Sequence, residues 1–328
     1  MEDKTRWGIL GTGAIAHAFA KGLAALPDAE LVAVGSRTRE SADRFGKEFG
    51  VPNRHASYEA LAGDAGVEAV YVATPHPFHK ENTLLCLEAG KAVLCEKPFA
   101  MNSAEAELMV ARARDKGVFL MEAMWTHCFP AIRKVRELVA GGAIGGVRIV
   151  RVEFCFRSGW NPEGRLLNPH LGGGALLDVG VYTVALAQLI LGGEPDRIAA
   201  MAHIGETGVD EQSAMILGFD GGAMAVLTCA VRTSTPHEAC IFGTDGWIGI
   251  PHLFWQPDRI VLHASGRDEE MAFERLGNGY SFEAAEVMRC LREGRLESEA
   301  VPTARTLAVM RTLDRVRAQW GLTYPMEQ

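Results

Sequence analysis

The sequence lacks the features of a disulfide-bonded, zinc-binding or membrane-spanning protein. Its seven cysteines are odd in number and scattered, with no Cys-X-X-Cys pair, which argues against a disulfide framework and a zinc site. The longest apolar run, 179–191, contains Gln188 and is shorter than the roughly 20 residues of a membrane span. The charged first residues lead directly into a strand-like segment, so we expect no secretory leader and a cytoplasmic protein.

The sequence also has no surplus of basic residues. Its 33 Lys and Arg residues face 41 Asp and Glu residues, for a formal net charge of −8, which argues against nucleic acid as the main partner. The composition, 48% hydrophobic and 23% charged, is that of an ordinary globular protein. A chain of 328 residues exceeds what one hydrophobic core usually serves, so we expect two domains.

Short apolar runs alternate with amphipathic stretches in the first part of the chain. The apolar runs are 7–10, 31–34, 69–73, 92–94 and 118–121. The amphipathic stretches between them are 15–26, 41–50, 77–89 and 103–116. Continuous apolar strands separated by helices are what a parallel sheet covered on both faces requires. We therefore predict an α/β fold that begins with a Rossmann domain, a doubly wound parallel sheet, over residues 1–123.

From residue 147 onward, apolar and polar residues alternate instead. The alternating segments are 147–154, 198–204, 213–219, 223–231, 239–243, 247–250 and 260–263. Two helical stretches follow, 281–293 and 303–320. This order predicts a C-terminal α/β domain, residues 124–328, with an open and mostly antiparallel sheet. Its strands leave apolar surface on the open face, so we expect a homodimer through this sheet.

Residues 11–16 fit the pattern Gly-X-Gly-X-X-Ala between an apolar strand and a helix. The first glycine permits a tight turn, the second lets backbone approach a pyrophosphate, and the helix N-terminus supplies N–H groups and a positive dipole. The pattern predicts dinucleotide binding, with a glycine-rich turn that binds nothing as the alternative. The cofactor contacts predicted here are Gly11, Thr12, Gly13, Ala14 and Ile15.

The second strand is followed by Ser36, Arg37 and Arg39, and the first acid after it is Glu40. NAD-specific sites place a carboxylate here, on the ribose 2′-hydroxyl, whereas a guanidinium and a hydroxyl suit a 2′-phosphate. We therefore predict that Ser36, Arg37 and Arg39 bind NADP(H) in preference to NAD(H). The alternative is a solvated basic turn.

Two further strand ends carry candidate residues, because doubly wound sheets bind ligands at the carboxyl ends of their strands. Glu96 and Lys97 follow the run 92–94, and Pro98 fixes the backbone so that Lys97 can face the cofactor; a surface charge is the alternative. The end of the run 69–73 adds Thr74, Pro75, His76 and His79 as predicted cofactor contacts, with a turn and helix cap as the alternative. No carboxylate or Cys completes a ligand set with these histidines, so we expect no metal.

Residues 172–182 are the most informative stretch of the chain. Three glycines precede a helix in which Asp178 and Tyr182, four residues apart, share one face. Gly180 leaves room for a ligand or for a neighbouring backbone. Asp178 and Tyr182 are therefore candidate catalytic residues, and an ordinary helix surface with a half-buried aromatic ring is the alternative.

Together these motifs resemble the glucose-fructose oxidoreductase, inositol dehydrogenase and rhizopine catabolism (Gfo/Idh/MocA) family. The resemblance covers essentially the whole chain, and its most specific motifs are 96–98 and 172–182, roughly 80 residues apart. Many members have His where this chain has Tyr182. Tyrosine there, with segments 76–80, 85–98 and 119–126, is similar to the NADP-dependent branch that oxidises trans-dihydrodiols and D-xylose. That branch usually has Arg at the position of His127, a departure that affects the substrate more than the chemistry.

The resemblance implies a Rossmann domain followed by an open-sheet domain, and hydride transfer between NADP(H) and a secondary alcohol of a trans-dihydrodiol or sugar. It implies Lys97 and Tyr182 as the catalytic pair, with Asp178 as a carboxylate that orients Lys97 or accepts a second substrate hydroxyl. A phenol has a pKa of about 10, so Tyr182 needs the ammonium of Lys97 to act as a base near neutral pH. The predicted substrate contacts are Trp125, His127, Arg157 and Asp178.

Other functions share these motifs. An aldose dehydrogenase, or a reductase of dicarbonyls or keto-sugars, would use the same residues. A non-catalytic NADP(H)-binding sensor would keep the fold without the chemistry, and the intact Lys97, Asp178 and Tyr182 argue against it.

Overall fold

The computed structural model describes residues 4–327, so residues 1–3 of the charged amino terminus lie outside the described part. The chain divides into two compact units. Unit 1 comprises Met1–Ala100, Ala104–Trp125 and Arg275–Thr303, and unit 2 comprises Met101–Ser103, Thr126–Glu274 and Ala304–Gln328. The main division lies close to the predicted boundary after residue 123, but the segment 275–303 falls in the first unit rather than the second.

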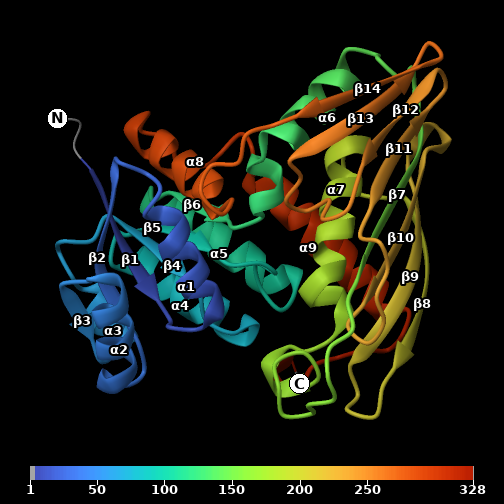
Figure 1. Cartoon of the computed structure of the whole chain (residues 1–328). Helices are drawn as coiled ribbons and strands as arrows, with labels where there is room; N and C mark the ends of the chain where they lie inside the picture. The colour runs from blue at the N-terminus through green and yellow to red at the C-terminus, as the bar shows by residue number, and fades with distance from the viewer. Residues whose placement is uncertain (1–3, 328) are drawn as a thin grey trace. The chain divides into compact units, whose positions relative to one another are not determined.

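Unit 1 contains a six-stranded parallel sheet in the order β3-β2-β1-β4-β5-β6. Its strands are β1 (Thr5–Leu10), β2 (Ala29–Gly35), β3 (Asn53–His55), β4 (Ala69–Val72), β5 (Ala92–Cys95) and β6 (Leu120–Glu122). The helices between them are α1 (Ala14–Leu23), α2 (Arg39–Phe49), α3 (Tyr58–Ala62), α4 (His79–Glu88) and α5 (Ser103–Lys116) (Figure 1). The strand order confirms the predicted doubly wound sheet. The sequence does not predict β3 and α3, because such short segments show no periodic pattern.

Helix α8 (Tyr280–Arg292) belongs to unit 1, not to the second domain that the sequence predicts. Side chains at its start bind the end of α1: Asn278 Nδ2 donates to the carbonyl of Ala18, and Ser281 Oγ donates to that of Gly22, each at 2.8 Å. Gly22 permits this approach, since a Cβ there would lie 2.6 Å from Asn278 Oδ1. Periodicity predicts that a helix forms here, but it does not identify the packing partner.

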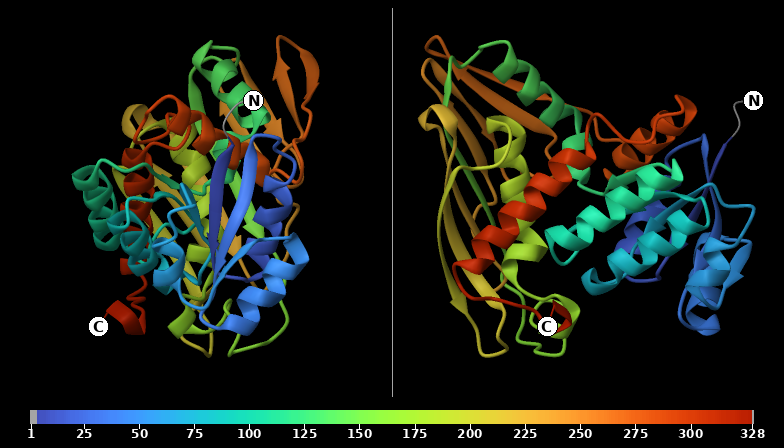
Figure 2. Two further views of the ribbon diagram at one scale, coloured as in Figure 1. Left: turned by 90° about the vertical axis from the view of Figure 1, so that its left-hand side faces the viewer. Right: turned by 180° about the vertical axis from the view of Figure 1, so that it is seen from behind.

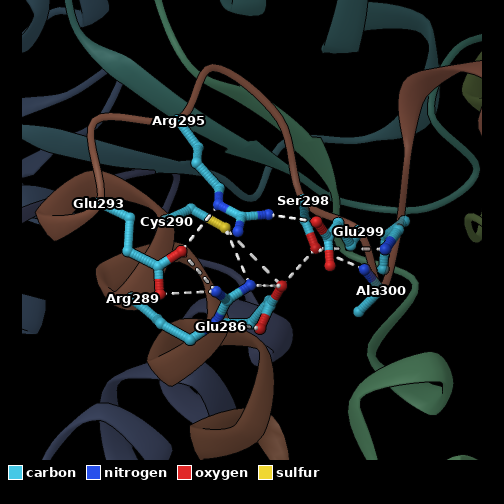
Figure 3. Close-up of polar contacts among 9 residues, drawn as sticks. Glu286, Arg289, Cys290, Glu293, Arg295, Ser298, Glu299 and Ala300 are labelled. Atoms are coloured by element: carbon cyan, nitrogen blue, oxygen red, sulfur yellow. Dashed lines mark hydrogen bonds and ion pairs between the residues drawn. The ribbon is translucent and has the colours of Figure 1, made fainter.

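An ion-pair network fixes the end of α8 and the loop that follows it (Figure 3). The guanidinium of Arg289 donates to both oxygens of Glu286 and both oxygens of Glu293, at 2.7–3.1 Å. Arg295 pairs with Glu293 at 2.7 Å, and the hydroxyl of Ser298 donates to Glu286. The loop is thereby held against the helix that precedes it.

Unit 2 contains an eight-stranded sheet in the order β14-β13-β12-β11-β7-β10-β9-β8. The strands are β7 (Val147–Cys155), β8 (Arg197–Ile204), β9 (Asp210–Gly218), β10 (Met224–Ala230), β11 (Ala239–Gly243), β12 (Gly246–Ile250), β13 (Arg259–Ala264) and β14 (Arg267–Ala272). Strands β7 and β10 run parallel and the other neighbours are antiparallel. The open, mostly antiparallel sheet confirms the prediction. The sequence does not predict β14, whose residues are mostly charged.

Three helices cover one face of this sheet (Figure 2). They are α6 (Pro130–Ala140), α7 (Val181–Leu191) and α9 (Thr303–Ala318). On β10, Ala225 and Leu227 are buried, whereas their neighbours Met224 and Val226 are exposed. This alternation is the two-residue period of a strand, and it leaves large apolar side chains on the sheet's outer face.

The segment Pro169–Leu191 has 23 residues and contains an 18-residue stretch with a mean hydropathy of 1.8, so by length and composition it could cross a membrane. In the structure, 83% of its most apolar window is buried inside the protein. Its helical part ends in α7, which packs against β7 and β10. The high hydropathy of this segment is therefore that of a core helix.

Candidate active site

The glycine-rich turn of unit 1 connects β1 to α1. Gly11 has a φ of +109°, and a Cβ there would lie 2.8 Å from the carbonyl oxygen of Ala73, so both its conformation and its close contact require glycine. Gly13 is the N-cap of α1, and a Cβ there would meet no atom within 4 Å. No side chain caps this helix within residues 4–327. The first N–H groups of α1 are therefore not capped by a side chain, and uncapped groups of this kind at a helix start are those that bind a pyrophosphate.

The loop after β2 lies beside this turn. The hydroxyl of Ser36 is 3.5 Å from that of Thr12. The guanidinium of Arg39 donates to the carbonyl of Arg54. Arg37 is exposed, and among the described residues it makes no hydrogen bond or ion pair. Of the two arginines predicted to bind a 2′-phosphate, Arg37 is therefore the one whose guanidinium is uncommitted.

A buried histidine, His79, holds the loop after β4 in place. The two ring nitrogens of His79 lie 2.8 Å from the carbonyl oxygens of Thr74 and Pro98, and burial lowers the pKa of the ring. His79 thereby joins the loop after β4 to the turn after β5. Pro75 is exposed and His76 is half-buried, so these two residues reach the surface of the loop.

Lys97 follows β5 in a turn whose Lys97–Pro98 peptide is cis. One oxygen of the buried Glu96 carboxylate accepts from the N–H of Lys97 at 3.1 Å, and the other accepts from the hydroxyl of Tyr71. Tyr71 is in turn stacked on Phe19, with 3.8 Å between ring centroids. The backbone of Lys97 is therefore fixed through Tyr71 and Phe19, two residues that the sequence motifs do not reveal.

A second carboxyl group, that of Glu283 in α8, is buried close to Glu96. Burial and the charge of Glu96 raise the pKa of Glu283 well above its usual range. Neither of its oxygens has a hydrogen-bond partner in the described part of the chain, so nothing there offsets the cost of burying the charged form of Glu283. At the start of the same helix, Tyr280 stacks on the buried Trp125, with 4.1 Å between ring centroids. One face of the Trp125 ring is thereby covered within unit 1.

In unit 2, Asp178 and Tyr182 lie on one continuous helix. It begins with a π-helical turn, Leu176–Gly180, and continues as α7. Such turns are frequent at functional sites. Asp178 is 4% exposed, and its carboxylate accepts from the guanidinium of Arg165 at 2.7 Å. Tyr182 is 6% exposed, so the helix carries a paired carboxylate and a nearly buried phenol.

An aromatic cluster lies next to the phenol. Phe154 of β7 is 5.5 Å from the ring of Tyr182 and stacks on Trp255 at 3.8 Å. His237 and Phe254 lie 5.4 Å and 5.9 Å from Phe154. These residues come from separate segments, so no linear motif predicts the cluster. It provides an apolar wall beside Tyr182.

The other predicted substrate residues of unit 2, His127 and Arg157, differ in their surroundings. His127 is buried, and burial, with the charges of Arg305 and Arg136, lowers its pKa to about 3. Its ring is therefore neutral at physiological pH. Arg157 is exposed, and its backbone N–H donates to the hydroxyl of Ser234 at 3.0 Å.

The potential metal ligands of the described residues do not form a metal centre. Within residues 4–327, no group of three or more His, Cys, Asp or Glu side chains is arranged to hold a metal ion. All seven cysteines are free and buried. Burial raises the pKa of the Cys86 thiol to about 12, so this thiol is protonated and unreactive at neutral pH.

Two family models match this chain. The first, described as the oxidoreductase family with an NAD-binding Rossmann fold, covers residues 5–124. The second, the GFO/IDH/MocA C-terminal domain, covers residues 132–249. The two matches fall on the parallel sheet of unit 1 and on the sheet of unit 2.

Curated relatives match over nearly the full length. The trans-1,2-dihydrobenzene-1,2-diol dehydrogenase of Mus musculus is 41% identical, over 98% of this chain and 99% of that protein. The human protein of the same name is 37% identical over the same shares.

Solved structures share the fold. A 3-ketoreductase from Actinomadura kijaniata, in complex with NADP and TDP-benzene, is 27% identical with a TM-score of 0.86, over 96% of this chain and 98% of that chain. An aldose-aldose oxidoreductase from Caulobacter crescentus, complexed with glycerol, is 27% identical with a TM-score of 0.88, over 97% and 98%. Motifs, fold and relatives agree, and the chain belongs to the GFO/IDH/MocA family of oxidoreductases.

Proposed function

We propose that the chain is a dehydrogenase that exchanges a hydride between NADP(H) and a secondary alcohol of a trans-dihydrodiol or a sugar. The observation that carries the proposal is the nearly buried phenol of Tyr182, which shares a helix with Asp178 and has its ring beside Phe154. This arrangement suits a cyclic diol. Tyr182 would exchange a proton with one hydroxyl, Asp178 would accept a hydrogen bond from the second hydroxyl, and Phe154 would contact the ring. The mouse relative, at 41% identity, is named for such a substrate.

The residues of unit 1 fit a dinucleotide, because no side chain caps the start of α1 and a Cβ at Gly13 would meet no atom within 4 Å, which leaves the helix start for a pyrophosphate. When bound, the nicotinamide accepts or supplies the hydride. The 2′-phosphate is assigned to Ser36, Arg37 and Arg39, and chiefly to Arg37, whose exposed guanidinium can fork onto a phosphate. The remaining proposed cofactor contacts are Gly11, Thr12, Gly13, Ala14, Ile15, Thr74, Pro75, His76, His79, Glu96 and Lys97.

Tyr182 is the proposed proton donor and acceptor. In oxidation the substrate hydroxyl gives its proton to the phenolate, and in reduction the phenol protonates the substrate oxygen. A free phenol has a pKa of about 10, so a phenolate near neutral pH requires a neighbouring cation. That role is assigned to the ammonium of Lys97, whose backbone is held by Glu96.

Asp178 is the proposed acceptor for a second substrate hydroxyl. Its carboxylate is already oriented by Arg165, and an ionised carboxylate offers only acceptor positions. Two hydroxyls bound at once, one by Tyr182 and one by Asp178, would fix the orientation of a vicinal diol. Trp125, His127 and Arg157 are the further proposed substrate contacts.

A second candidate is the reduction of a keto-sugar or dicarbonyl. It is favoured by the similarity to the 3-ketoreductase from Actinomadura kijaniata, at a TM-score of 0.86. Tyr182 would then donate its proton to the carbonyl oxygen. The residues required are the same, so a substrate panel distinguishes the two candidates.

The purified protein is expected to reduce NADP⁺ with trans-dihydrodiols of benzene or naphthalene, because the Phe154–Trp255 stack suits a planar ring. Absorbance of the reduced nicotinamide measures turnover, with D-xylose, D-glucose and myo-inositol as comparison substrates. Turnover confined to the aldoses would assign a sugar substrate, and turnover of dicarbonyls with NADPH alone would favour the reductase. NADPH binding without turnover of any of these compounds would contradict the proposed substrates and would point to another carbonyl substrate or to a non-catalytic NADP(H)-binding sensor.

Replacing Tyr182 with Phe removes one hydroxyl and keeps the ring beside Phe154. We expect kcat to fall by at least about 10²-fold, the usual contribution of general acid–base catalysis. Affinity for NADPH should change by no more than about twofold, since the proposed nucleotide contacts lie in unit 1. Steady-state kinetics and NADPH fluorescence titration give the two values. If turnover stays within a few-fold of the parent, Tyr182 is not the proton donor.

Replacing Arg37 with Ala is expected to reduce the preference for NADP⁺ over NAD⁺ by about tenfold or more, because a charge-assisted hydrogen bond to the phosphate is lost. The ratio of kcat/KM for the two cofactors measures the effect. Arg44→Ala is the matched control, because Arg44 is also exposed and pairs with Glu40 on α2. Equal shifts in both variants would mean a general charge effect and would contradict the assignment.

A homodimer through the outer face of the unit 2 sheet completes the proposal. Directly paired residues point to the same face of a sheet, and on this face Ile149 pairs with Met224 while Val226 pairs with Ile216. Met201 on β8 extends the row and is 80% exposed. A contiguous apolar patch of this kind is typical of an interface, and a second copy would bring an identical patch to cover it.

We expect light scattering at micromolar concentration to give the mass of a dimer. Combining Met201→Lys with Ile216→Lys should give monomers, because unpaired charges would be buried in the interface. Leu108→Lys is the matched control, since Leu108 is an exposed leucine on α5 of unit 1. A monomeric parent protein would contradict the proposal.

The cytoplasm is the proposed location, because thiols stay reduced there. The support is that the chain's seven cysteines are free and buried. The proposed partners are the cofactor and a small-molecule substrate, with no nucleic acid and no membrane. Fractionation of the source cells tests the location.

A further inference from the structure

The helix that carries Asp178 and Tyr182 begins deep inside unit 2. Its first N–H groups have no partner within the helix, and burial makes an unpaired N–H costly. Asp210, the first residue of β9, meets this need. Its side chain is 0% exposed, and its Oδ2 accepts from the N–H of Leu176 at 2.7 Å.

The glycines before this helix leave room for the carboxylate. Gly174 has a φ of +118°, and a Cβ there would lie 2.2 Å from Asp210 Oδ1. Tyr324 closes the same site, because its hydroxyl donates to the carbonyl of Gly173 at 2.8 Å. Gly174 is therefore required both by its backbone conformation and by the space that the Asp210 carboxylate occupies.

Ionisation of the buried Asp210 carboxyl lowers the stability of the folded protein. Burial raises its pKa to about 7, although the backbone N–H groups of Leu176 and Ala175 lower it. Oδ1 has no hydrogen-bond partner among the described residues. A carboxyl whose pKa is raised by folding stabilises the fold below its unfolded pKa of about 3.9. That contribution is lost as the pH rises through 7.

The helix is also fixed one turn further along. Gly180 lies against β10, where a Cβ would be 2.9 Å from Cys229 Sγ, and the hydroxyl of Thr183 donates to the Gly180 carbonyl at 2.8 Å. With its start held by Asp210 and Gly180 held against the sheet, the helix has little freedom to rotate or slide. The place of the Tyr182 hydroxyl follows from these two anchors.

We infer that Asp210 is a positioning residue for proton transfer, because it fixes the start of the helix on which Tyr182 and Asp178 lie. The inference rests on the proposed function, in which Tyr182 exchanges the proton. It adds a residue that touches neither substrate nor cofactor. A displacement of about 1 Å at a reacting group can reduce a rate on the order of 10²-fold, so loss of this anchor should lower turnover.

Replacing Asp210 with Ala removes the acceptor for the Leu176 N–H. We expect kcat to fall by about tenfold or more, with NADPH affinity changed by no more than about twofold because the proposed nucleotide contacts lie in unit 1. Asp210→Asn keeps an oxygen that can accept the same hydrogen bond, and it should restore kcat to within about threefold of the parent. A loss in Asp210→Asn equal to that in Asp210→Ala, or no loss in either, would overturn the inference.

Thr312→Val is the matched control for a merely structural effect. The hydroxyl of Thr312, on α9, accepts a hydrogen bond from Nε2 of Gln188 at 2.6 Å. Gln188 lies in the second half of α7, so loss of this hydrogen bond destabilises the same helix away from its start. We expect this variant to lower Tm by a few degrees and to leave kcat unchanged. If the loss of kcat per degree of Tm lost is the same in Thr312→Val and in Asp210→Ala, the role of Asp210 is only structural.

Combining Asp210→Ala with Tyr182→Phe separates the inference from the function beneath it. The residual turnover of Tyr182→Phe no longer depends on where a phenolic hydroxyl lies, so Asp210→Ala should lower it by a smaller factor than it lowers the parent, with the remaining loss due to displacement of Asp178. If Tyr182→Phe alone keeps its turnover, the proposed function fails. If Tyr182→Phe loses turnover and Asp210→Ala does not, only the role of Asp210 fails.

If Asp210→Ala does not fold, the pH dependence of the Tm of Asp210→Asn provides a second test. The Tm of Asp210→Asn minus the Tm of the parent should increase as the pH rises from about 5 to about 8. The parent loses stability when Asp210 ionises, whereas Asn does not ionise. The titratable groups facing Asp210 are Cys229 and Tyr324, and burial raises the pKa of each well above its usual range, so neither ionises over this interval. A Tm difference that does not change with pH would contradict the inference, because it would mean that Asp210 is not a buried carboxyl at the start of the helix.

Discussion

The N–H groups at the start of a helix lack partners within the helix, and this constraint shapes the functional residues of both units. At α1 of unit 1, no side chain caps the first N–H groups beyond the N-cap Gly13, and an anionic ligand is able to pair with such groups. At Leu176 of unit 2 the helix start is buried, and the carboxylate of Asp210 completes it from within. One helix start is thus uncapped within unit 1, where we propose that the cofactor binds, and the other accepts a carboxylate from within unit 2.

Buried carboxyl groups recur around these helices and strand ends, and their ionisation follows from their partners. Glu96 accepts from a backbone N–H and from a tyrosine hydroxyl, and it holds the turn that carries Lys97. Glu283 lies near that charge without a hydrogen-bond partner of its own, and its pKa is raised well above the usual range. Burial first, and the charge of Glu96 second, disfavour ionisation of Glu283.

Local sequence patterns predict most of the architecture. Continuous apolar runs predict the parallel sheet of unit 1, alternating residues predict the antiparallel sheet of unit 2, and the motif 11–16 lies where a strand meets a helix. Patterns fail where a segment is short, as in β3 and α3, or where an edge strand is charged, as in β14. Periodicity needs several residues and one buried face, and these segments offer too little of either.

The sequence by itself determined the two sheet types, the glycine turn and the spacing of Asp178 and Tyr182, because each depends on residues that are near neighbours along the chain. Only the tertiary structure decided that α8 packs on α1, that Phe154 and Trp255 stack beside Tyr182, and that Asp210 holds the start of its helix. These contacts join segments far apart in sequence, and no local pattern specifies which distant side chain will arrive. The physical reason is that burial and hydrogen bonding select a partner by its place in the folded protein, which the chain reaches only when both sheets have formed.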